Sequence, residues 1–258
     1  MTLPPPLSRR DFCRSLGAAA VAYGCNRGGG GPVAAAGDGR LTARPGGPRT
    51  GTVTTGIQEL DQSSGERRHW LLIPSDYDPA TPWPLALFYR GAITPARTYL
   101  DAFLPYCNEF GLAMLAPEAT DGTWDLVLGG FGPDVASTDQ ALAETFRRVA
   151  VDPARVSISG FSDGGSYALS LGVTNGDFLT RIAAYSPGFF SPAARRGQPE
   201  FFVTHGTQDA VLPIDATSRP IVTELRRLDY QVDYREFEGP HAVSLTLARE
   251  SIQWMARS

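Results

Sequence analysis

A serine in a glycine-rich pentapeptide has the most specific chemistry that this sequence suggests. Gly160-Phe161-Ser162-Asp163-Gly164 follows the apolar run 155–159 and precedes a segment with helical periodicity. A nucleophile at such a tight strand-to-helix turn needs a sparsely populated backbone conformation, so glycines two residues before and after it remove Cβ atoms that would clash. The turn also exposes the hydroxyl and aims the positive end of the helix at it. The same pentapeptide arises by chance in loops, but in this context it predicts Ser162 as a nucleophile.

A serine hydroxyl is a weak nucleophile near neutral pH and needs a histidine base, which an acid holds in the correct tautomer. Where the serine sits on this type of turn, the chain order is serine, acid, histidine. Only His241 fits that order, because His69 and His205 precede every plausible acid. His241 lies between the last strand-like run and the last helix-like segment, and we predict it as the base. His205 is expected to form hydrogen bonds within its own loop.

Asp209 is the predicted acid. It lies in the sequence His-Gly-Thr-Gln-Asp at 205–209, directly after the apolar run 201–204, where a strand is expected to end. The competing acids lie within a predicted helix or at or in the last predicted strand: Asp215, Asp229 and Asp233. Sites in sheets of parallel strands form beyond the carboxyl ends of the strands, and this favours Asp209.

Strand-like and helix-like segments alternate along most of the chain. Residues 51–60 and 68–73 suit an antiparallel hairpin around a polar turn at 61–66. Apolar runs typical of strands buried on both faces cover residues 85–89, 112–116, 155–159, 181–185, 201–204 and 232–237. Helical periodicity covers residues 95–110, 135–150, 162–172, 214–228 and 242–256. The alternation predicts an α/β fold with a mostly parallel central sheet, helices on both faces and antiparallel strands at the N-terminal side.

Three separated motifs resemble those of a known family. They are Gly-Phe-Ser-Asp-Gly-Gly at 160–165, His-Gly-Thr-x-Asp at 205–209 followed by Val-Leu-Pro at 211–213, and Gly-Pro-His at 239–241. Together they look like the small phospholipase/carboxylesterase group of α/β-hydrolases, and they are also similar to polyhydroxybutyrate-depolymerase and feruloyl-esterase-like enzymes. The resemblance covers about residues 52–258. It implies the α/β-hydrolase fold and ester hydrolysis through an acyl-enzyme without cofactor or metal, and the short body leaves little room for a lid.

The resemblance also implies where an oxyanion hole forms. By position, the backbone N–H groups of Ala92 and Asp163 are the expected donors. Enzymes of this group usually place His-Gly after the third strand, whereas this chain has Arg90 and Gly91 there. Because backbone groups make the hole, Arg90 need not abolish it, but it can alter the loop or add positive charge near the mouth.

Trp124 and Asp125 are candidate substrate-binding residues. They lie in the glycine-rich stretch 121–133, after the fourth strand-like run. The alternative is that Trp124 packs beneath a loop.

Composition excludes several classes of function. The formal net charge of −4 argues against binding the phosphate backbone of nucleic acids. All 23 basic residues are arginines, so a P-loop lysine, a Schiff-base lysine and a serine-lysine dyad are impossible. The three cysteines and three histidines lack the spacing of metal ligands, and we expect neither a metal nor another cofactor.

The first fifty residues have the character of an export signal and a linker. The sequence Ser-Arg-Arg-Asp-Phe at 8–12 and the short apolar stretch 16–23 resemble a bacterial twin-arginine signal, predicted over residues 1–25. The stretch is too short to span a bilayer. The expected product is periplasmic or extracellular, either anchored through a lipidated Cys25 or cleaved near Ala36, in the small-residue run 34–36. Residues 26–50 are rich in Gly, Pro and Ala and predict a disordered linker, followed by a catalytic domain at 51–258.

These patterns favour a serine hydrolase that cleaves carboxylic esters of small molecules, lipids or polymers. Acyl transfer and peptide cleavage would proceed through the same acyl-enzyme, so the sequence does not separate them from ester hydrolysis. The departure at Arg90 and the linker leave open a further alternative, a catalytically impaired, surface-tethered binding module.

Overall fold

The computed structural model describes residues 37–46, 49, 53–60, 68–92 and 94–257. The predicted export signal, Cys25 and Ala36 lie outside the described residues, as do the polar turn at 61–66 and the first residues of the expected strand 51–60. No helix in the described part of the chain is both long and apolar enough to cross a bilayer.

In the described residues, eight strands form one sheet in the order β1-β2-β4-β3-β5-β6-β7-β8. Their bounds are β1 Gly56–Leu60, β2 His69–Ile73, β3 Trp83–Tyr89, β4 Ala113–Ala116, β5 Val151–Phe161, β6 Arg181–Tyr185, β7 Glu200–Gly206 and β8 Val232–Phe237. β2 pairs antiparallel with both β1 and β4, and the strands from β4 to β8 are parallel. The predicted α/β fold, with its antiparallel N-terminal strands, is confirmed.

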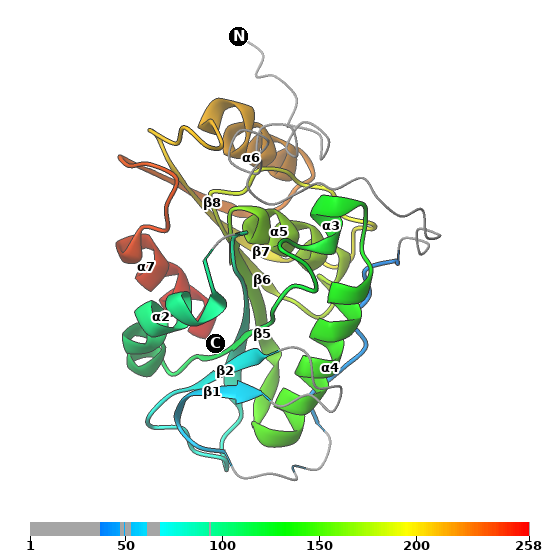
Figure 1. Cartoon of the computed structure of the whole chain (residues 1–258), viewed down its shortest axis with the longest axis vertical. Coiled ribbons are helices and arrows are strands. Elements are labelled where there is room, and N and C mark those ends of the chain that lie inside the picture. Colours follow the sequence, from blue (N-terminus) through cyan, green and yellow to red (C-terminus); the bar gives the residue numbers. More distant parts are fainter. Residues whose placement is uncertain (1–36, 47–48, 50–52, 61–67, 93, 258) are drawn as a thin grey trace.

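Helices cover both faces of the sheet (Figure 1). Their bounds are α2 Ala96–Phe110, α3 Asp125–Leu128, α4 Pro133–Arg148, α5 Asp163–Thr174, the 3-10 helix η3 Ile214–Ala216, α6 Ser218–Arg227 and α7 Leu245–Ala256. Side chains alternate between faces along each strand. Accordingly, Leu85 and Leu87 of β3 pack in the core cluster that includes α4, α5 and α6, whereas Ala86 and Phe88 pack with α2 and α7.

The predicted helix 214–228 is split in the structure. The segment forms the short 3-10 helix η3, and α6 begins only at Ser218. Thr217 between them has φ −125° and ψ −92°, which is outside the helical region. Pro220 gives the physical reason, because it has no N–H to donate to a carbonyl four residues earlier and is tolerated only in a first turn. The other corrections are small: α7 begins at Leu245 rather than at 242, and α3 was not predicted.

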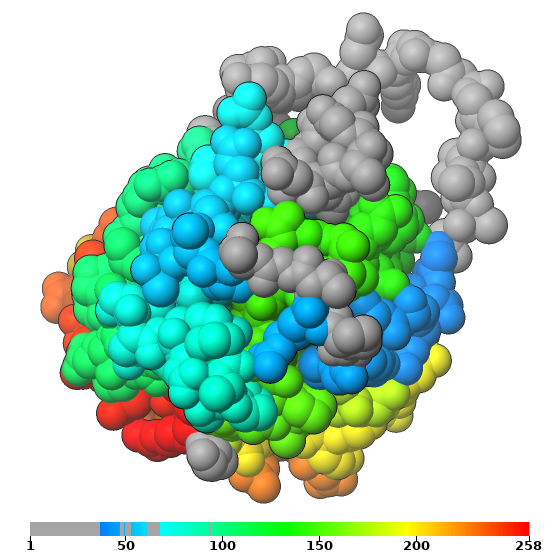
Figure 2. Space-filling view, turned by 90° about the horizontal axis from the view of Figure 1, so that it is seen from below, coloured from blue at the N-terminus to red at the C-terminus, as the bar shows by residue number. Residues whose placement is uncertain are grey.

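The expectation of a disordered linker over 26–50 is wrong for residues 37–46, which form part of the blue surface beside green atoms in Figure 2. Their hydrogen bonds reach Asp139 of α4 and Asn175, which follows α5. The Leu41 side chain is buried in the core, and its N–H donates to Oδ1 of Asn175 at 2.9 Å. The Nδ2 of Asn175 donates to the Gly39 carbonyl at 2.8 Å, and Arg40 pairs with Asp177. These partners lie more than one hundred residues away in sequence, so no local pattern could indicate them.

Candidate active site

The turn between β5 and α5 holds Ser162 in a strained conformation. Its φ is 60° and its ψ is −122°, a region that costs a non-glycine residue about 1–3 kcal/mol. A Cβ atom on Gly160 would overlap the Gly164 carbonyl, and one on Gly164 would overlap the carbonyls of Tyr89 and Arg90. The two glycines of the motif are therefore required because the turn packs directly against the end of β3.

The structure brings Ser162, His241 and Asp209 into one hydrogen-bonded row. His241 Nε2 lies 2.9 Å from Ser162 Oγ, and His241 Nδ1 lies 2.6 Å from Asp209 Oδ2. An ionised carboxylate only accepts hydrogen bonds, so Nδ1 carries the proton and Nε2 is free to accept from the hydroxyl. The imidazole packs on the ring of Phe161, with 4.8 Å between ring centroids. This arrangement can take the proton from Ser162 as its oxygen attacks a carbonyl carbon.

The loops that carry the acid and the base are joined to each other. The N–H of Gln208 donates to the Gly239 carbonyl at 2.9 Å, and that of Thr207 donates to the Phe237 carbonyl at 2.8 Å. A Cβ atom on Gly206 would overlap the carbonyls of Gly239 and Pro240. The glycine after His205 therefore allows the close approach that places Asp209 beside His241.

Asp209 is held by four N–H groups, of which the sequence predicted only that of His241. Its Oδ1 accepts from the backbone N–H groups of Val211 and Leu212, at 2.9 and 2.7 Å. Its Oδ2 lies 3.0 Å from Nε2 of the buried His205, in addition to the bond from His241. Burial by itself would raise the pKa of Asp209, but the contacts from His205, His241 and Leu212 outweigh it and hold the pKa well below 3.8.

His205 does bond within its own loop, as predicted, because its Nε2 also lies 2.9 Å from the Leu212 carbonyl oxygen. Both neighbours of Nε2 are acceptors, so this nitrogen carries the proton. Its Nδ1 lies 2.5 Å from Ser218 Oγ at the start of α6. The sequence signal that could have revealed the contact between His205 and Asp209 is their spacing of four residues on one tight loop.

The two expected oxyanion donors belong to segments that adjoin Ser162. The N–H of Asp163 belongs to the first residue of α5, where the helix presents its positive end. Gly91 lies against the nucleophile, since a Cβ atom there would lie 3.3 Å from Ser162 Cβ, and Ala92 follows it. Burial raises the pKa of the Asp163 carboxyl to about 6, opposed by hydrogen bonds from the Thr123 hydroxyl and the Gly164 N–H.

The expectation that Trp124 and Asp125 line a substrate pocket needs correction. Trp124 is fully buried beneath the loop that follows β3, where its Nε1 donates to the Arg90 carbonyl at 2.8 Å. Asp125 is buried as well, and its Oδ2 accepts from the N–H groups of Gly132 and Asp134. Burial, together with the nearby Asp134 charge, raises the pKa of Asp125 to about 6. Both residues therefore support the loops of the site from below.

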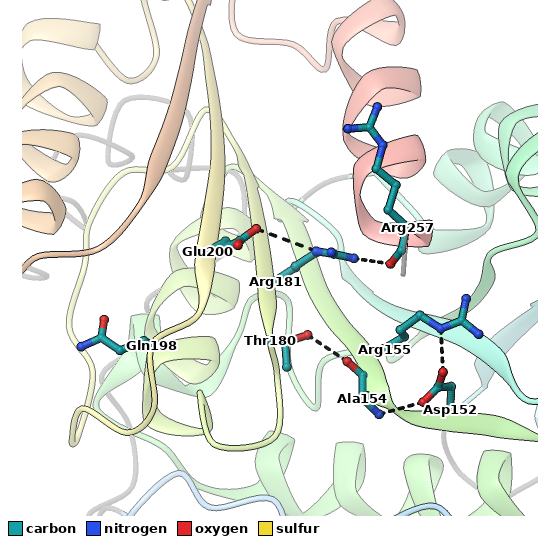
Figure 3. A pocket seen from close by; sticks show the side chains of 8 residues that line it. All are labelled: Asp152, Ala154, Arg155, Thr180, Arg181, Gln198, Glu200 and Arg257. Atoms are coloured by element: carbon teal, nitrogen blue, oxygen red, sulfur yellow. Dashed lines mark hydrogen bonds and ion pairs between the residues drawn. The ribbon is translucent and has the colours of Figure 1, made fainter.

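A hollow of about 410 Å³ lies toward the amino ends of the central strands β5, β6 and β7 (Figure 3). Its lining includes Arg155 of β5, Arg181 of β6 and Glu200 of β7. These residues lie toward the amino ends of their strands, whereas Ser162 follows the carboxyl end of β5. The hollow is therefore separate from the site at Ser162. Within the described residues, no cluster of His, Cys, Asp and Glu side chains could hold a metal ion.

Comparison with solved structures identifies the fold. S-formylglutathione hydrolase FrmB from Staphylococcus aureus has a TM-score of 0.63 and 15% identity, covering 78% of this chain and 98% of that one. The fluorophosphonate-binding serine hydrolase FphF from Staphylococcus aureus has a TM-score of 0.62 and 16% identity, covering 82% and 100%. A ferulic acid esterase from Anaeromyces mucronatus has a TM-score of 0.57 and 14% identity, covering 79% and 89%.

No family model and no curated protein matches the chain. The structural likenesses, at low identity, show that the chain has the α/β-hydrolase fold found in these esterases and hydrolases.

Proposed function

We propose that the chain is a serine hydrolase that cleaves carboxylic esters, with Ser162 as nucleophile, His241 as base and Asp209 as the acid that orients the base. The observation that carries the proposal is the hydrogen-bonded row from Ser162 Oγ through His241 to Asp209. The strained turn at Ser162 and the fold shared with esterases support it. The three sequence motifs favour the small phospholipase/carboxylesterase group within this fold.

The geometry suggests how the reaction proceeds. Ser162 Oγ attacks the ester carbonyl carbon while His241 Nε2 takes the hydroxyl proton, and the N–H groups of Ala92 and Asp163 stabilise the oxyanion. His241 then gives that proton to the alcohol oxygen, the C–O bond breaks, and an acyl-enzyme forms on Ser162. His241 then takes a proton from water as the water oxygen attacks the acyl carbon. The bond to Ser162 Oγ breaks, His241 returns the proton to that oxygen, and the carboxylic acid leaves.

Side chains near the site favour an ester with an apolar part. Val211, two residues after Asp209, and Leu245, four residues after His241, are exposed large hydrophobic side chains, and we propose that they contact the apolar part of the ester. Residues 186–199 between β6 and β7 are all described and contain no helix, which suits an open acyl site.

A nitrophenyl ester series of rising acyl length tests the proposal. We expect turnover by the intact protein, loss of turnover in Ser162→Ala, and covalent labelling of Ser162 by a fluorophosphonate probe. Turnover retained by Ser162→Ala would contradict the mechanism. Absence of both labelling and turnover in the intact protein would favour the inactive binding module. Competition between water, alcohol and amine acceptors separates hydrolysis from acyl transfer.

We also propose that the protein is exported through its twin-arginine motif at Arg9 and Arg10. Mass spectrometry of the mature N-terminus tests this. A lipidated Cys25 would show a membrane anchor, cleavage near Ala36 would show a released product, and an intact N-terminus would contradict export by a cleaved signal.

A further inference from the structure

Arg90 lies at the position where the enzymes that this sequence resembles usually have a histidine. In the structure its side chain is only 12% exposed, and its Nε donates to Glu118 Oε2 at 2.6 Å. The second carboxylate oxygen of Glu118 accepts from the N–H of Ala96, the first residue of α2, at 3.3 Å. A guanidinium that is only partly exposed and is paired with a carboxylate does not act as a free positive charge at the mouth of the site, so Arg90 needs another explanation.

The remaining donors of Arg90 bind the backbone of its own loop. Its Nη1 donates to the carbonyl oxygens of Gly91 and Ala92, at 2.9 and 3.2 Å, and lies 3.5 Å from that of Gly122. The Arg90 carbonyl is held as well, because it accepts from Nε1 of Trp124 at 2.8 Å. The loop after β3 is therefore fixed both by the side chain and by the main chain of Arg90.

Because peptide units are planar, the contact between Arg90 and the Gly91 carbonyl also fixes the direction of the Ala92 N–H. The described residues contain no cis peptide bond, and in a trans peptide the C=O and the N–H point in opposite directions. The Gly91 carbonyl and the Ala92 N–H belong to one peptide unit. Since the carbonyl points toward the guanidinium, the Ala92 N–H points away from it.

The order of the strands shows what lies on that other side. β3, which precedes Arg90, lies between β4 and β5. Glu118, which holds the guanidinium, follows β4, whereas Ser162 directly follows β5. Gly91 itself lies against Ser162, because a Cβ atom on it would lie 3.3 Å from Ser162 Cβ. The strand order therefore puts Glu118, which holds the guanidinium, on the β4 side of the Gly91–Ala92 peptide and Ser162 on its β5 side.

We propose that Arg90 is a positioning residue for the oxyanion hole: its guanidinium, held by Glu118, binds the Gly91 and Ala92 carbonyls and so keeps the Ala92 N–H directed at the oxyanion formed on Ser162. The inference rests on the proposed function, because it concerns the same hole. Arg90 touches no reacting atom. A guanidinium suits this role because its planar fork binds a carboxylate through one nitrogen while another nitrogen reaches two carbonyls.

Replacement of Arg90 by methionine tests the proposal, because methionine keeps an apolar stem and removes every donor. Loss of one oxyanion donor lowers kcat about 10²- to 10³-fold, so we expect Arg90→Met to lower kcat by about 10²-fold with KM little changed. Binding of a trifluoromethyl ketone, whose serine adduct carries an oxyanion, should weaken in parallel with kcat. The control is Arg249→Met, which removes a surface arginine paired with Glu109 and should leave both quantities unchanged.

A second variant, Arg90→Gln, keeps a polar side chain and covers the case in which Arg90→Met fails to fold.

A chemical-rescue experiment uses a third variant, Arg90→Ala. Guanidinium added at a concentration below denaturation should restore part of its kcat, an effect that a purely structural role would not produce. An active intact protein together with a folded Arg90 variant whose kcat and ketone affinity match it would overturn the proposal. If the intact protein itself neither turns over esters nor reacts with a fluorophosphonate, the proposed function fails instead.

Discussion

His205 offers a test of how the acid of the site is held. The Asp209 carboxylate is contacted by four N–H groups, at 2.6 Å from His241, 2.7 Å from Leu212, 2.9 Å from Val211 and 3.0 Å from His205. His205→Leu removes the longest of these contacts and leaves three, and it also removes the bonds of His205 to the Leu212 carbonyl and the Ser218 hydroxyl. Losing one hydrogen bond to a buried charged group costs about 1.5–3 kcal/mol, and we expect a fall of about 2 kcal/mol in the free energy of unfolding at pH 7.

His205→Leu should lower kcat less, in free-energy terms, than it lowers the free energy of unfolding. Three donors still hold Asp209, so it stays ionised at neutral pH, and only the orientation of His241 loosens. We expect kcat to fall about 10-fold, or about 1.4 kcal/mol, compared with about 10⁴-fold for loss of the acid itself. His205→Gln keeps an N–H donor near the position of Nε2 and should restore most of both losses.

The stability difference also has a predicted pH dependence. A carboxyl whose pKa is lowered in the folded protein contributes stability above its usual pKa, here 3.8, and loses it as the pH falls toward the folded value. The difference in the free energy of unfolding between the intact protein and His205→Leu should therefore be largest above about pH 5. It should become smaller below pH 3.8.

Urea unfolding across this pH range and steady-state turnover of a nitrophenyl ester measure the two effects. The matched control is Ser251→Ala, which removes a buried hydrogen bond to the Tyr185 hydroxyl of 2.6 Å. It should cost about 1 kcal/mol of stability without changing kcat. If His205→Leu unfolds with the same free energy as the intact protein, and turns over substrate at the same rate, the reasoning is refuted.

Two other substitutions test the surroundings of the site. Burial raises the pKa of Asp163 to about 6, so its stabilising contribution is complete below 3.8 and is lost as the pH rises through about 6. Asp163→Asn keeps the acceptor for the Gly164 N–H. It should raise the free energy of unfolding by up to about 3 kcal/mol at pH 8 and leave it unchanged below about pH 4. A lower free energy of unfolding at pH 8 would contradict this prediction. Asn175→Leu removes the bonds to Gly39 and Leu41. It should make residues 37–46 sensitive to protease while kcat stays unchanged, and equal resistance would contradict a role of Asn175 in holding them.

Sequence alone was enough to predict the order and type of most elements and the residues of the hydrogen-bonded row. The strands 181–185 and 232–237 appear at the predicted bounds. The apolar run 181–185 is buried, as its composition predicts, whereas 232–237 forms the edge strand β8, which is partly exposed and not buried on both faces as expected. The glycines around Ser162 signal the tight turn, because the backbone there leaves no room for a side chain. Chain order then selected His241, and the position directly after a predicted strand selected Asp209.

Only the tertiary structure decided which contacts are made by the residues around Ser162, His241 and Asp209. His205 reaches Asp209, Arg90 binds the carbonyls of its own loop, and Trp124 lies beneath that loop rather than in a pocket. The segment 37–46, despite a composition typical of a linker, packs through Leu41 against residues more than one hundred positions away. Periodicity and turn chemistry reflect neighbours in the chain, whereas these contacts depend on which distant backbone groups the fold places within hydrogen-bond reach.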